Sequence, residues 1–250
     1  MITSLTSRFH RNLSWRAAFL ICSLAILTIS FLPDRVHAQS TITVVSAANY
    51  TAPVPQEGIV SGFGTNLATG TAPATETPLP TTLAGATVKV KDAGGTERDA
   101  PLFYVAPTQI NFQIPQGTTT GTATITVKNG STTVATGTVV VSSVAPTIFT
   151  ADSSGSGLAA ANILRVRGGV QSYEIMVRYD STQAKMVSVP VDMSLETDQV
   201  FLLLYGTGFR NRNTSNPVVC TVGGVTAEVT YAGAQPQFVG LDQINVKLPR

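Results

Sequence analysis

Polar and apolar residues alternate along two short segments of the chain that nearly repeat each other. Residues 108–115 read Thr-Gln-Ile-Asn-Phe-Gln-Ile-Pro, and residues 242–249 read Asp-Gln-Ile-Asn-Val-Lys-Leu-Pro. In each copy three apolar side chains alternate with polar ones, which is the period-two pattern of a strand with one buried face. Proline then ends each strand, because it has no amide hydrogen for a ladder bond. We therefore expect two equivalent strands, each with its apolar face toward a core.

A second pair of similar boxes lies upstream of these strands, in the same order. The boxes are Phe63-Gly64-Thr65-Asn66-Leu67 and Tyr205-Gly206-Thr207-Gly208-Phe209. From box to strand the spacing is 44 positions in the first copy (Thr65 to Gln109) and 36 in the second (Thr207 to Gln243). We assign the eight-residue difference to the Pro- and Thr-rich segment 72–82, since loops accept insertions at small entropic cost. The pattern predicts a β unit duplicated in tandem.

Alternation and turn residues also predict the other strands of the first unit. They fall at 41–45, 58–64, 86–91, 101–105, 122–128 and 133–141. Asn129-Gly130 between the last two is a strong signal for a tight hairpin, because both residues tolerate positive φ. Short strands rich in Thr and Val at this density are typical of an immunoglobulin-like β-sandwich. Residues 39–145 are therefore expected to form a first sandwich.

The rest of the chain predicts a linker and β-meander at 146–195, followed by a second, incomplete immunoglobulin-like unit at 196–250. The expected strands lie at 163–167, 173–179, 185–191, 200–205, 218–222 and 226–231. The second unit stops soon after its closing strand, whereas the first has two more strands. We expect the second sandwich to be truncated, or the meander or a partner to supply its missing edge. The predicted fold class is all-β, with tandem immunoglobulin-like β-sandwiches, the second apparently truncated, and an inserted β-meander.

The first 38 residues have the layout of a secretory signal peptide. Arg8, Arg11 and Arg16 precede an uncharged run at 17–32, and Val36-His37-Ala38 supplies small residues for cleavage before Gln39. A membrane anchor is the alternative, but this run of 16 residues is shorter than the roughly 20 that a spanning helix needs. The segment predicts export through the secretory pathway, a secreted or cell-surface location, and no membrane span after cleavage.

Cleavage would change the composition of the chain. Four basic and one acidic residue would leave, so that 16 Lys and Arg become 12 and 14 Asp and Glu become 13. This balance excludes the basic surface that nucleic-acid binding requires.

No histidine follows His37, and Cys220 is the only later cysteine, which excludes imidazole-based catalysis and zinc sites built from His and Cys. Cys220 lies in an apolar strand pattern and is expected to be buried.

Carboxylates remain as candidate catalytic residues of a hydrolase, because glycosidases need only two of them about 5 to 10 Å apart. The candidates are Asp152, Glu174, Asp180, Glu196, Asp198 and Asp242. Their spacing singles out no pair, and solvated surface charge explains each. Oxygen ligands near Asp152 or Asp198 would suit calcium, but no full loop pattern is present. We predict that the chain is not an enzyme, with no catalytic, cofactor-binding or metal-binding residue and no cofactor.

The remaining class of function is a non-catalytic extracellular interaction or structural module of a secreted, surface-associated protein, and its partner stays open between a surface protein and a polysaccharide. Loops at 66–82 and 211–216 are candidate contact segments for such a partner. A carbohydrate-binding module is the alternative, supported by four tyrosines that could be exposed: Tyr50, Tyr173, Tyr179 and Tyr231.

The pairs Gln109 with Asn111 and Gln243 with Asn245 recur in both units, so we expect a structural role in bonding the backbone.

Four longer segments carry a resemblance to a known family. They are Ala100-Pro-Leu-Phe-Tyr-Val-Ala-Pro-Thr-Gln-Ile-Asn111, Ala145-Pro-Thr-Ile-Phe-Thr150, Leu203-Leu-Tyr-Gly-Thr-Gly208 and the stretch 231–245. From about residue 47 onward the chain resembles the Solibacter-type uncharacterised C-terminal domain family of large secreted bacterial proteins. Its strand order and glycine boxes are similar to IPT/TIG domains. The resemblance implies an extracellular pair of β-sandwiches and no assigned catalytic residue.

Overall fold

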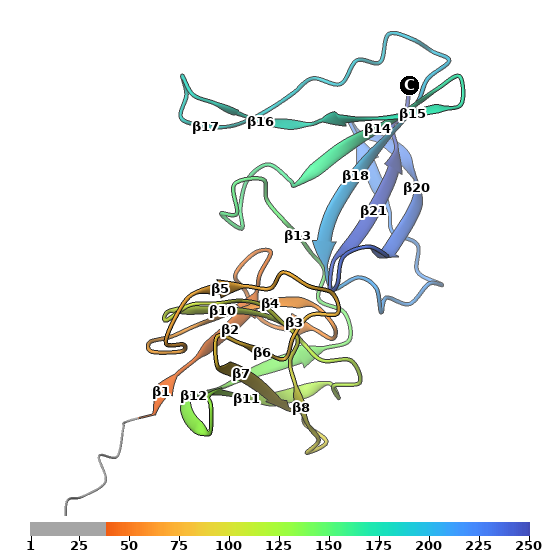
Figure 1. Ribbon diagram of the computed structural model, residues 1–250. Helices are drawn as coiled ribbons and strands as arrows, with labels where there is room; N and C mark the ends of the chain where they lie inside the picture. Colours follow the sequence, from red (N-terminus) through yellow and green to blue (C-terminus); the bar gives the residue numbers. More distant parts are fainter. Residues whose placement is uncertain (1–38) are drawn as a thin grey trace, which may run out of the picture. The chain divides into compact units, whose positions relative to one another are not determined.

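The computed structural model describes residues 39–250, which form strands, turns and loops without a helix. The chain is all-β, as the sequence predicts, and its strands gather into several separate sheets (Figure 1). The signal peptide expected at 1–38 lies outside the described residues. Residues 39–250 form one compact unit by their internal contacts.

The first half of this unit is a two-layer β-sandwich (Figure 1). One sheet has the order β1-β12-β11-β7-β6, with β3 beside β12 and β8 beside β7. Its strands are β1 (Ser40–Thr41), β3 (Val54–Pro55), β6 (Thr82–Leu83), β7 (Ala86–Lys91), β8 (Glu97–Asp99), β11 (Gly121–Asn129) and β12 (Thr132–Ser142). The other has the order β2-β4-β10-β9-β5. Its strands are β2 (Thr43–Ser46), β4 (Ile59–Phe63), β5 (Ala72–Pro73), β9 (Leu102–Val105) and β10 (Gln109–Gln113).

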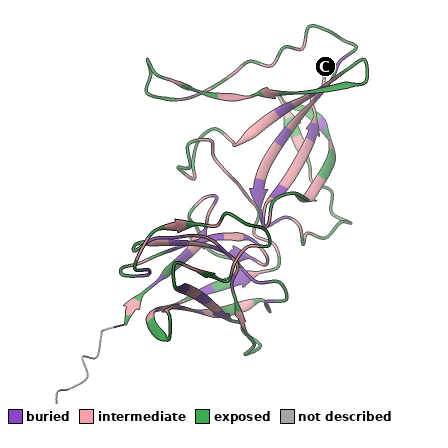
Figure 2. Ribbon diagram, viewed as in Figure 1, coloured by how far each residue is buried: buried purple, intermediate pink, exposed green. Residues whose placement is uncertain are grey.

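The core lies between these two layers and is made by the alternation of side chains along their strands. On β10 and just beyond it, Ile110, Phe112 and Ile114 are fully buried, whereas the polar residues between them are half-buried. β7 and β11 contribute the facing apolar layer. Figure 2 shows the buried residues concentrated on the strands of this half. The inward apolar face expected for the first closing strand is thus confirmed.

The second half contains one seven-stranded sheet in the order β15-β14-β18-β21-β20-β19, with β13 beside β18, and a separate two-stranded ribbon. Its strands are β13 (Thr147–Ile148), β14 (Ala161–Arg167), β15 (Val170–Ile175), β18 (Gln199–Thr207), β19 (Cys220–Val222), β20 (Val225–Ala234) and β21 (Asp242–Lys247). The ribbon pairs β16 (Val177–Asp180) with β17 (Lys185–Ser188). Leu202, Leu204 and Ile244 on the inward face of β18 and β21 are half-buried. The residues that correspond to Leu202 and Ile244 in the first half, Val60 on β4 and Ile110 on β10, are fully buried.

Part of the predicted meander joins the sheet of the second unit, which is the alternative in which the meander supplies an edge to that unit. β14 pairs along its length with β18, so β14 and β15 belong to the sheet of the second half. Only β16 and β17 form a free-standing hairpin. The strand expected at 173–179 is also broken at Met176, where a bend separates β15 from β16. Alternation identified these strands, but it does not say which neighbour a strand pairs with.

The two halves share a sheet order and a register. β4 and β10 pair with Phe63 opposite Gln109, and β18 and β21 pair with Tyr205 opposite Gln243. The order β2-β4-β10-β9 in the first half therefore matches β14-β18-β21-β20 in the second. The duplication expected from the repeated boxes is confirmed at the level of strand pairing.

The glycine boxes have the same local structure in both halves. A Cβ on Gly64 would lie 2.8 Å from the Thr41 carbonyl oxygen and 2.9 Å from Leu67, and a Cβ on Gly206 would collide with the Thr147 carbonyl and lie 2.8 Å from the ring of Phe209. The backbone of an earlier segment, at Thr41 or Thr147, therefore passes close to each glycine, and a side chain of the box itself, Leu67 or Phe209, packs against it. Asn66 and Gly208, at equivalent positions, both have positive φ, of 56° and 90°, which explains why the box carries Asn or Gly there.

Two further expectations have clear outcomes. The hairpin at Asn129-Gly130 is confirmed, since β11 and β12 pair on either side of it and Gly130 has a φ of 57°. Cys220 is half-buried and not buried, because it lies on the edge strand β19, which has a neighbour on one side only.

Substitution at Gly206 should destabilise the chain more than substitution at an open glycine. Gly206→Ala forces a methyl group against the Thr147 carbonyl and Phe209, and overpacking of this kind costs about 1 to 3 kcal/mol. Gly70→Ala is the matched control, because nothing lies within 4 Å of its Cβ position. Urea denaturation measures both free energies of unfolding. Equal values for the two variants would contradict the close crossing at Gly206.

Candidate functional site

The repeated Gln and Asn side chains form the same pair on the outward face of each half. The Gln109 amide Nε2 donates to Asn111 Oδ1 at 2.8 Å, and Gln243 Nε2 donates to Asn245 Oδ1 at 2.6 Å. Ser61 Oγ also donates to Asn111 Oδ1, at 3.0 Å. These are bonds between side chains, so the expected role in bonding the backbone is wrong. Period-two alternation places both amides on the face opposite the core.

In the second half this face is hollowed, and we call the depression the β21 hollow. Its volume is about 560 Å³. The residues that line it are Asn162, Tyr173, Leu203, Tyr205, Gln235, Gln237, Phe238, Leu241 and Gln243. Cross-strand pairing brings the central ones together, with Asn162 opposite Leu203 and Tyr205 opposite Gln243. None of the nine side chains carries a charge.

Two aromatic rings in the β21 hollow are open to solvent. Tyr173 on β15 is 67% exposed, and Phe238 in the loop between β20 and β21 is 62% exposed. The Phe238 loop is held in place by Gln235, whose Oε1 accepts from the backbone N–H groups of Gln237 at 2.6 Å and Phe238 at 2.9 Å. Single exposed rings are common on protein surfaces, but two that line one depression form a candidate contact surface.

The first half has a corresponding hollow around its own amide pair, which we call the β10 hollow. Its volume is about 400 Å³, and Tyr50, Ser61, Gln109 and Asn111 are among the residues that line it. The Tyr50 hydroxyl donates to the carbonyl of Ser153 at 2.8 Å, which fixes the direction of the ring. An amide pair and a partly exposed tyrosine thus recur together in both halves.

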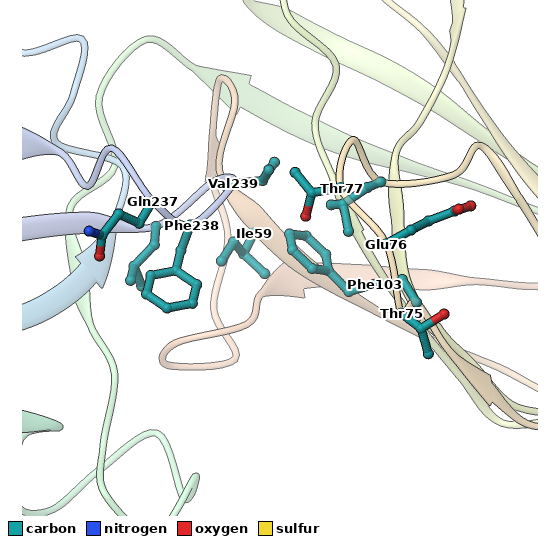
Figure 3. Close-up of a pocket in the computed structure, with 11 residues that line it drawn as sticks. Ile59, Thr75, Glu76, Thr77, Phe103, Gln237, Phe238 and Val239 are labelled. Carbon is teal, nitrogen blue, oxygen red and sulfur yellow. The ribbon is translucent and has the colours of Figure 1, made fainter.

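A third, more apolar depression lies beside the β21 hollow and shares Gln237, Phe238 and Leu241 with it. Figure 3 shows Phe103, Ile59 and Phe238 along it, with Thr75, Glu76 and Thr77 at its polar side. Its volume is about 470 Å³. Thr75 to Thr77 belong to the loop 66–82 expected to contact a partner, so the structure places part of that loop at a depression.

Arg165, near the end of β14 in the second half, is the centre of a network of charged side chains. Its guanidinium donates to Asp198 Oδ2 at 2.8 Å, to the Asp192 carbonyl at 2.9 Å and to both oxygens of Glu174. Arg167 bonds the same Asp198 with two nitrogens, at 2.7 and 2.9 Å. Hydrogen bonds from Arg167 and then Arg165 lower the pKa of Asp198 to about 2. Asp198 therefore stays ionised at neutral pH.

The C-terminal arginine holds the same segment from another side. Arg250 donates to the carbonyls of Met193 at 2.7 Å, Leu195 at 2.6 Å and Asp198 at 2.8 Å. Sequence reasoning did not single out these arginines, because nothing in their local pattern indicates which acceptors they reach.

Asp242 has a structural position of its own. Its Oδ2 accepts from the backbone N–H of Phe209 at 2.8 Å, and its Oδ1 accepts from Arg210 Nε at 2.7 Å. In the first half the equivalent N–H, on Leu67, donates to the Pro107 carbonyl at 2.9 Å. The Asp242 carboxylate thus accepts the backbone hydrogen bond of the second glycine box, and a backbone carbonyl accepts the corresponding bond of the first.

The remaining carboxylates that the sequence offered lie apart from one another. Asp152 accepts from Ser154, and Asp180 accepts from the backbone N–H groups of Thr182 and Gln183. Glu196 is exposed. Within residues 39–250 no group of three or more His, Cys, Asp or Glu is placed to hold a metal ion. Glu174 and Asp198 do meet, but around Arg165, and the guanidinium lowers the pKa of Glu174.

The four tyrosines expected at the surface are exposed: Tyr50, Tyr173, Tyr179 and Tyr231. The structure assigns them different surroundings, since Tyr173 lines the β21 hollow and Tyr50 the β10 hollow. Tyr179 lies on the free-standing ribbon, in β16.

No family model matches the chain, and a comparison with curated proteins also finds no match. Over the described residues, the structure contains no helix that is long and apolar enough to cross a membrane.

The charge network predicts a specific loss of stability in acid. The pKa of Asp198 is about 2 in the folded chain and about 3.9 for an ordinary aspartate, so the unfolded chain takes up the proton first as the pH falls. The contribution of Asp198 is complete above about pH 4 and disappears as the pH falls through about 2. In urea denaturation between pH 2 and 7, Asp198→Asn should lower stability at pH 7 and flatten the decline below pH 4.

Glu196→Gln is the control for this prediction, because Glu196 lies two positions away and is exposed. It should follow the unsubstituted chain at every pH. The same acid slope in Asp198→Asn and in the unsubstituted chain would show that Asp198 is not a source of the pH dependence.

Proposed function

We propose that this chain is a non-catalytic binding module of an exported, surface-associated bacterial protein. One observation carries the proposal: each half has a hydrogen-bonded Gln–Asn pair on its outward sheet face, and a hollow lined by the glutamine of that pair and by an exposed tyrosine. A purely structural duplication needs only the inward apolar side chains to recur. A recurring outward surface of hydrogen-bonding and aromatic groups is what a binding face requires.

The arrangement of the carboxylates supports binding over hydrolysis. A glycosidase needs one carboxylic acid that can give up a proton and a second carboxylate that can attack or activate water. Asp198 and Asp242 are instead buried against Arg165 and Arg210, and Glu174 also bonds Arg165. Carboxylates committed to arginines in this way hold segments of the chain together and do not offer a free acid–nucleophile pair.

Export is supported by the basic, apolar and small-residue segments of residues 1–38. The resemblance to a family of large secreted bacterial proteins points the same way and stays a prediction. In this proposal the chain acts outside the cell, where its two β halves hold the binding faces and no cofactor takes part. The carbohydrate-binding alternative is favoured by Tyr173 and Phe238, whose rings are open at the β21 hollow.

Expression of the full chain in a bacterial host tests the export step. We expect the protein in the periplasm or medium, with Gln39 as its first residue by intact mass, because small residues at positions 36 and 38 suit signal cleavage. Ala38→Phe is the control, since a bulky residue there should block processing. Protein that stays in the cytoplasm with its first 38 residues attached would contradict the proposal.

Co-sedimentation tests binding against catalysis. The purified protein is incubated with insoluble polysaccharides and with bacterial surface preparations, and both retention of the protein and release of soluble sugar or peptide are measured. We expect retention on at least one material and no release, because Glu174, Asp198 and Asp242 are engaged by arginines. Steady release of product, or no retention on any material, would overturn the assignment of a binding module.

A further inference from the structure

We propose that the β21 hollow is a binding site for a neutral oligosaccharide, with Tyr173 and Phe238 as the stacking rings and Asn162, Tyr205 and Gln243 as the hydrogen-bonding floor. This inference rests on the proposed binding function and names the ligand class and the residues. The argument uses the charge, the hydrogen-bonding capacity and the exposure of the lining residues.

The lining excludes a charged ligand as the preferred one. All nine side chains of the hollow are amides, phenols or apolar groups. A phosphate, a uronate or a basic peptide would lose its hydration there without gaining an opposite charge, which is a costly exchange. A ligand that is polar and uncharged suffers no such loss.

The polar groups of the floor offer donors and acceptors side by side. Asn162 Nδ2 donates to the Tyr205 hydroxyl at 3.4 Å, which leaves the hydroxyl hydrogen able to donate. Gln243 Nε2 donates one hydrogen to Asn245. Its second N–H can still donate to a ligand, and its own carbonyl oxygen can accept. A sugar hydroxyl is both donor and acceptor, so a row of such groups matches it better than a row of one kind.

The rings supply the apolar part of the site. Tyr173 and Phe238 are both more than half exposed and lie on different elements, β15 and the β20–β21 loop. Gln235 fixes the Phe238 loop before any ligand arrives, so little ordering is needed on binding. Rings of this kind stack on the C–H faces of pyranoses while hydroxyls reach the amides.

An extended peptide is the competing ligand, and the geometry favours it less. Peptides that add to sheets bond the main chain of an edge strand, whereas the polar groups here are side chains of β14, β18 and β21, which all lie inside the sheet. The volume of about 560 Å³ is within the usual range for small-molecule sites, roughly 300 to 1,000 Å³. A short glycan segment satisfies both observations.

Titration of the protein with neutral oligosaccharides tests the proposal. The probes are cellohexaose, maltohexaose, mannohexaose and xylohexaose, with oligogalacturonate as the charged control and an uncharged extended peptide as the competing class. We expect at least one neutral oligosaccharide to bind by calorimetry and the charged control not to bind. Tyr173→Ala should lower the affinity at least tenfold, and Gln243→Ala should also lower it.

Tyr179→Ala and Gln171→Ala are the matched controls. Tyr179 is 60% exposed, close to the value for Tyr173, but does not line the hollow, and Gln171 is an exposed glutamine on β15. Both should bind like the unsubstituted chain. Tyr173→Ala should keep the thermal midpoint of the unsubstituted chain, because its side chain is largely in solvent, so loss of binding cannot be attributed to unfolding.

Each other outcome overturns the inference. Failure of all four oligosaccharides, or binding that Tyr173→Ala leaves unchanged, removes the β21 hollow as a glycan site. Tyr173-dependent binding of the peptide shows that the hollow takes a different ligand. In all three cases retention on a surface preparation would leave the proposed binding module standing, whereas release of product or absence of any retention would reject that broader function.

Discussion

The pairing register of β4 with β10 in the first half, and of β18 with β21 in the second, determines the rest of the structure in each half. Phe63 lies opposite Gln109, and Tyr205 lies opposite Gln243. Because side chains alternate with period two, a slip of one residue would turn the apolar set outward and the amides inward. The crossing of the chain over Gly64 and Gly206 leaves no room for a side chain and helps to fix this register.

The two halves use the same pairing but cover their apolar faces differently. In the first half a second sheet buries Ile110, Phe112 and Ile114 completely. In the second half Val246 is buried, yet Leu202 and Ile244 remain half-buried. Arginine side chains, rather than a second apolar layer, tie the segment around Asp198 to the sheet. The outward face of this sheet carries amides and rings beside the buried Leu203.

The sequence predicted most of the strands because alternation, turn residues and the two repeats are local signals. The segment 86–91, for instance, is the strand β7. The sequence could not indicate which strands pair with each other when they lie far apart along the chain. The pairing of β14 with β18 depends on contacts between residues about 40 positions apart, and no local pattern encodes them. The β21 hollow was missed for the same reason, since Asn162, Tyr173 and Gln243 meet only after the sheet has formed.

The exposure of Tyr173 could be suspected from its place in a strand of mixed polarity, but the role of the amide pair was misjudged. Recurrence in both halves suggested a backbone bond, whereas the side chains bond each other and leave the rest of the amide open. A repeated outward residue is therefore as much a sign of a shared surface as of shared structure.

The most direct test of this account is the register itself, measured by nuclear Overhauser effects between backbone protons in solution. We predict contacts between Phe63 and Gln109 and between Tyr205 and Gln243, as opposed residues of antiparallel pairs. These contacts would place both amides on the outward face. Contacts of Tyr205 with Asp242 or Ile244 as its opposed residue would mean a slipped strand, with Gln243 turned inward, and would contradict the duplicated binding face.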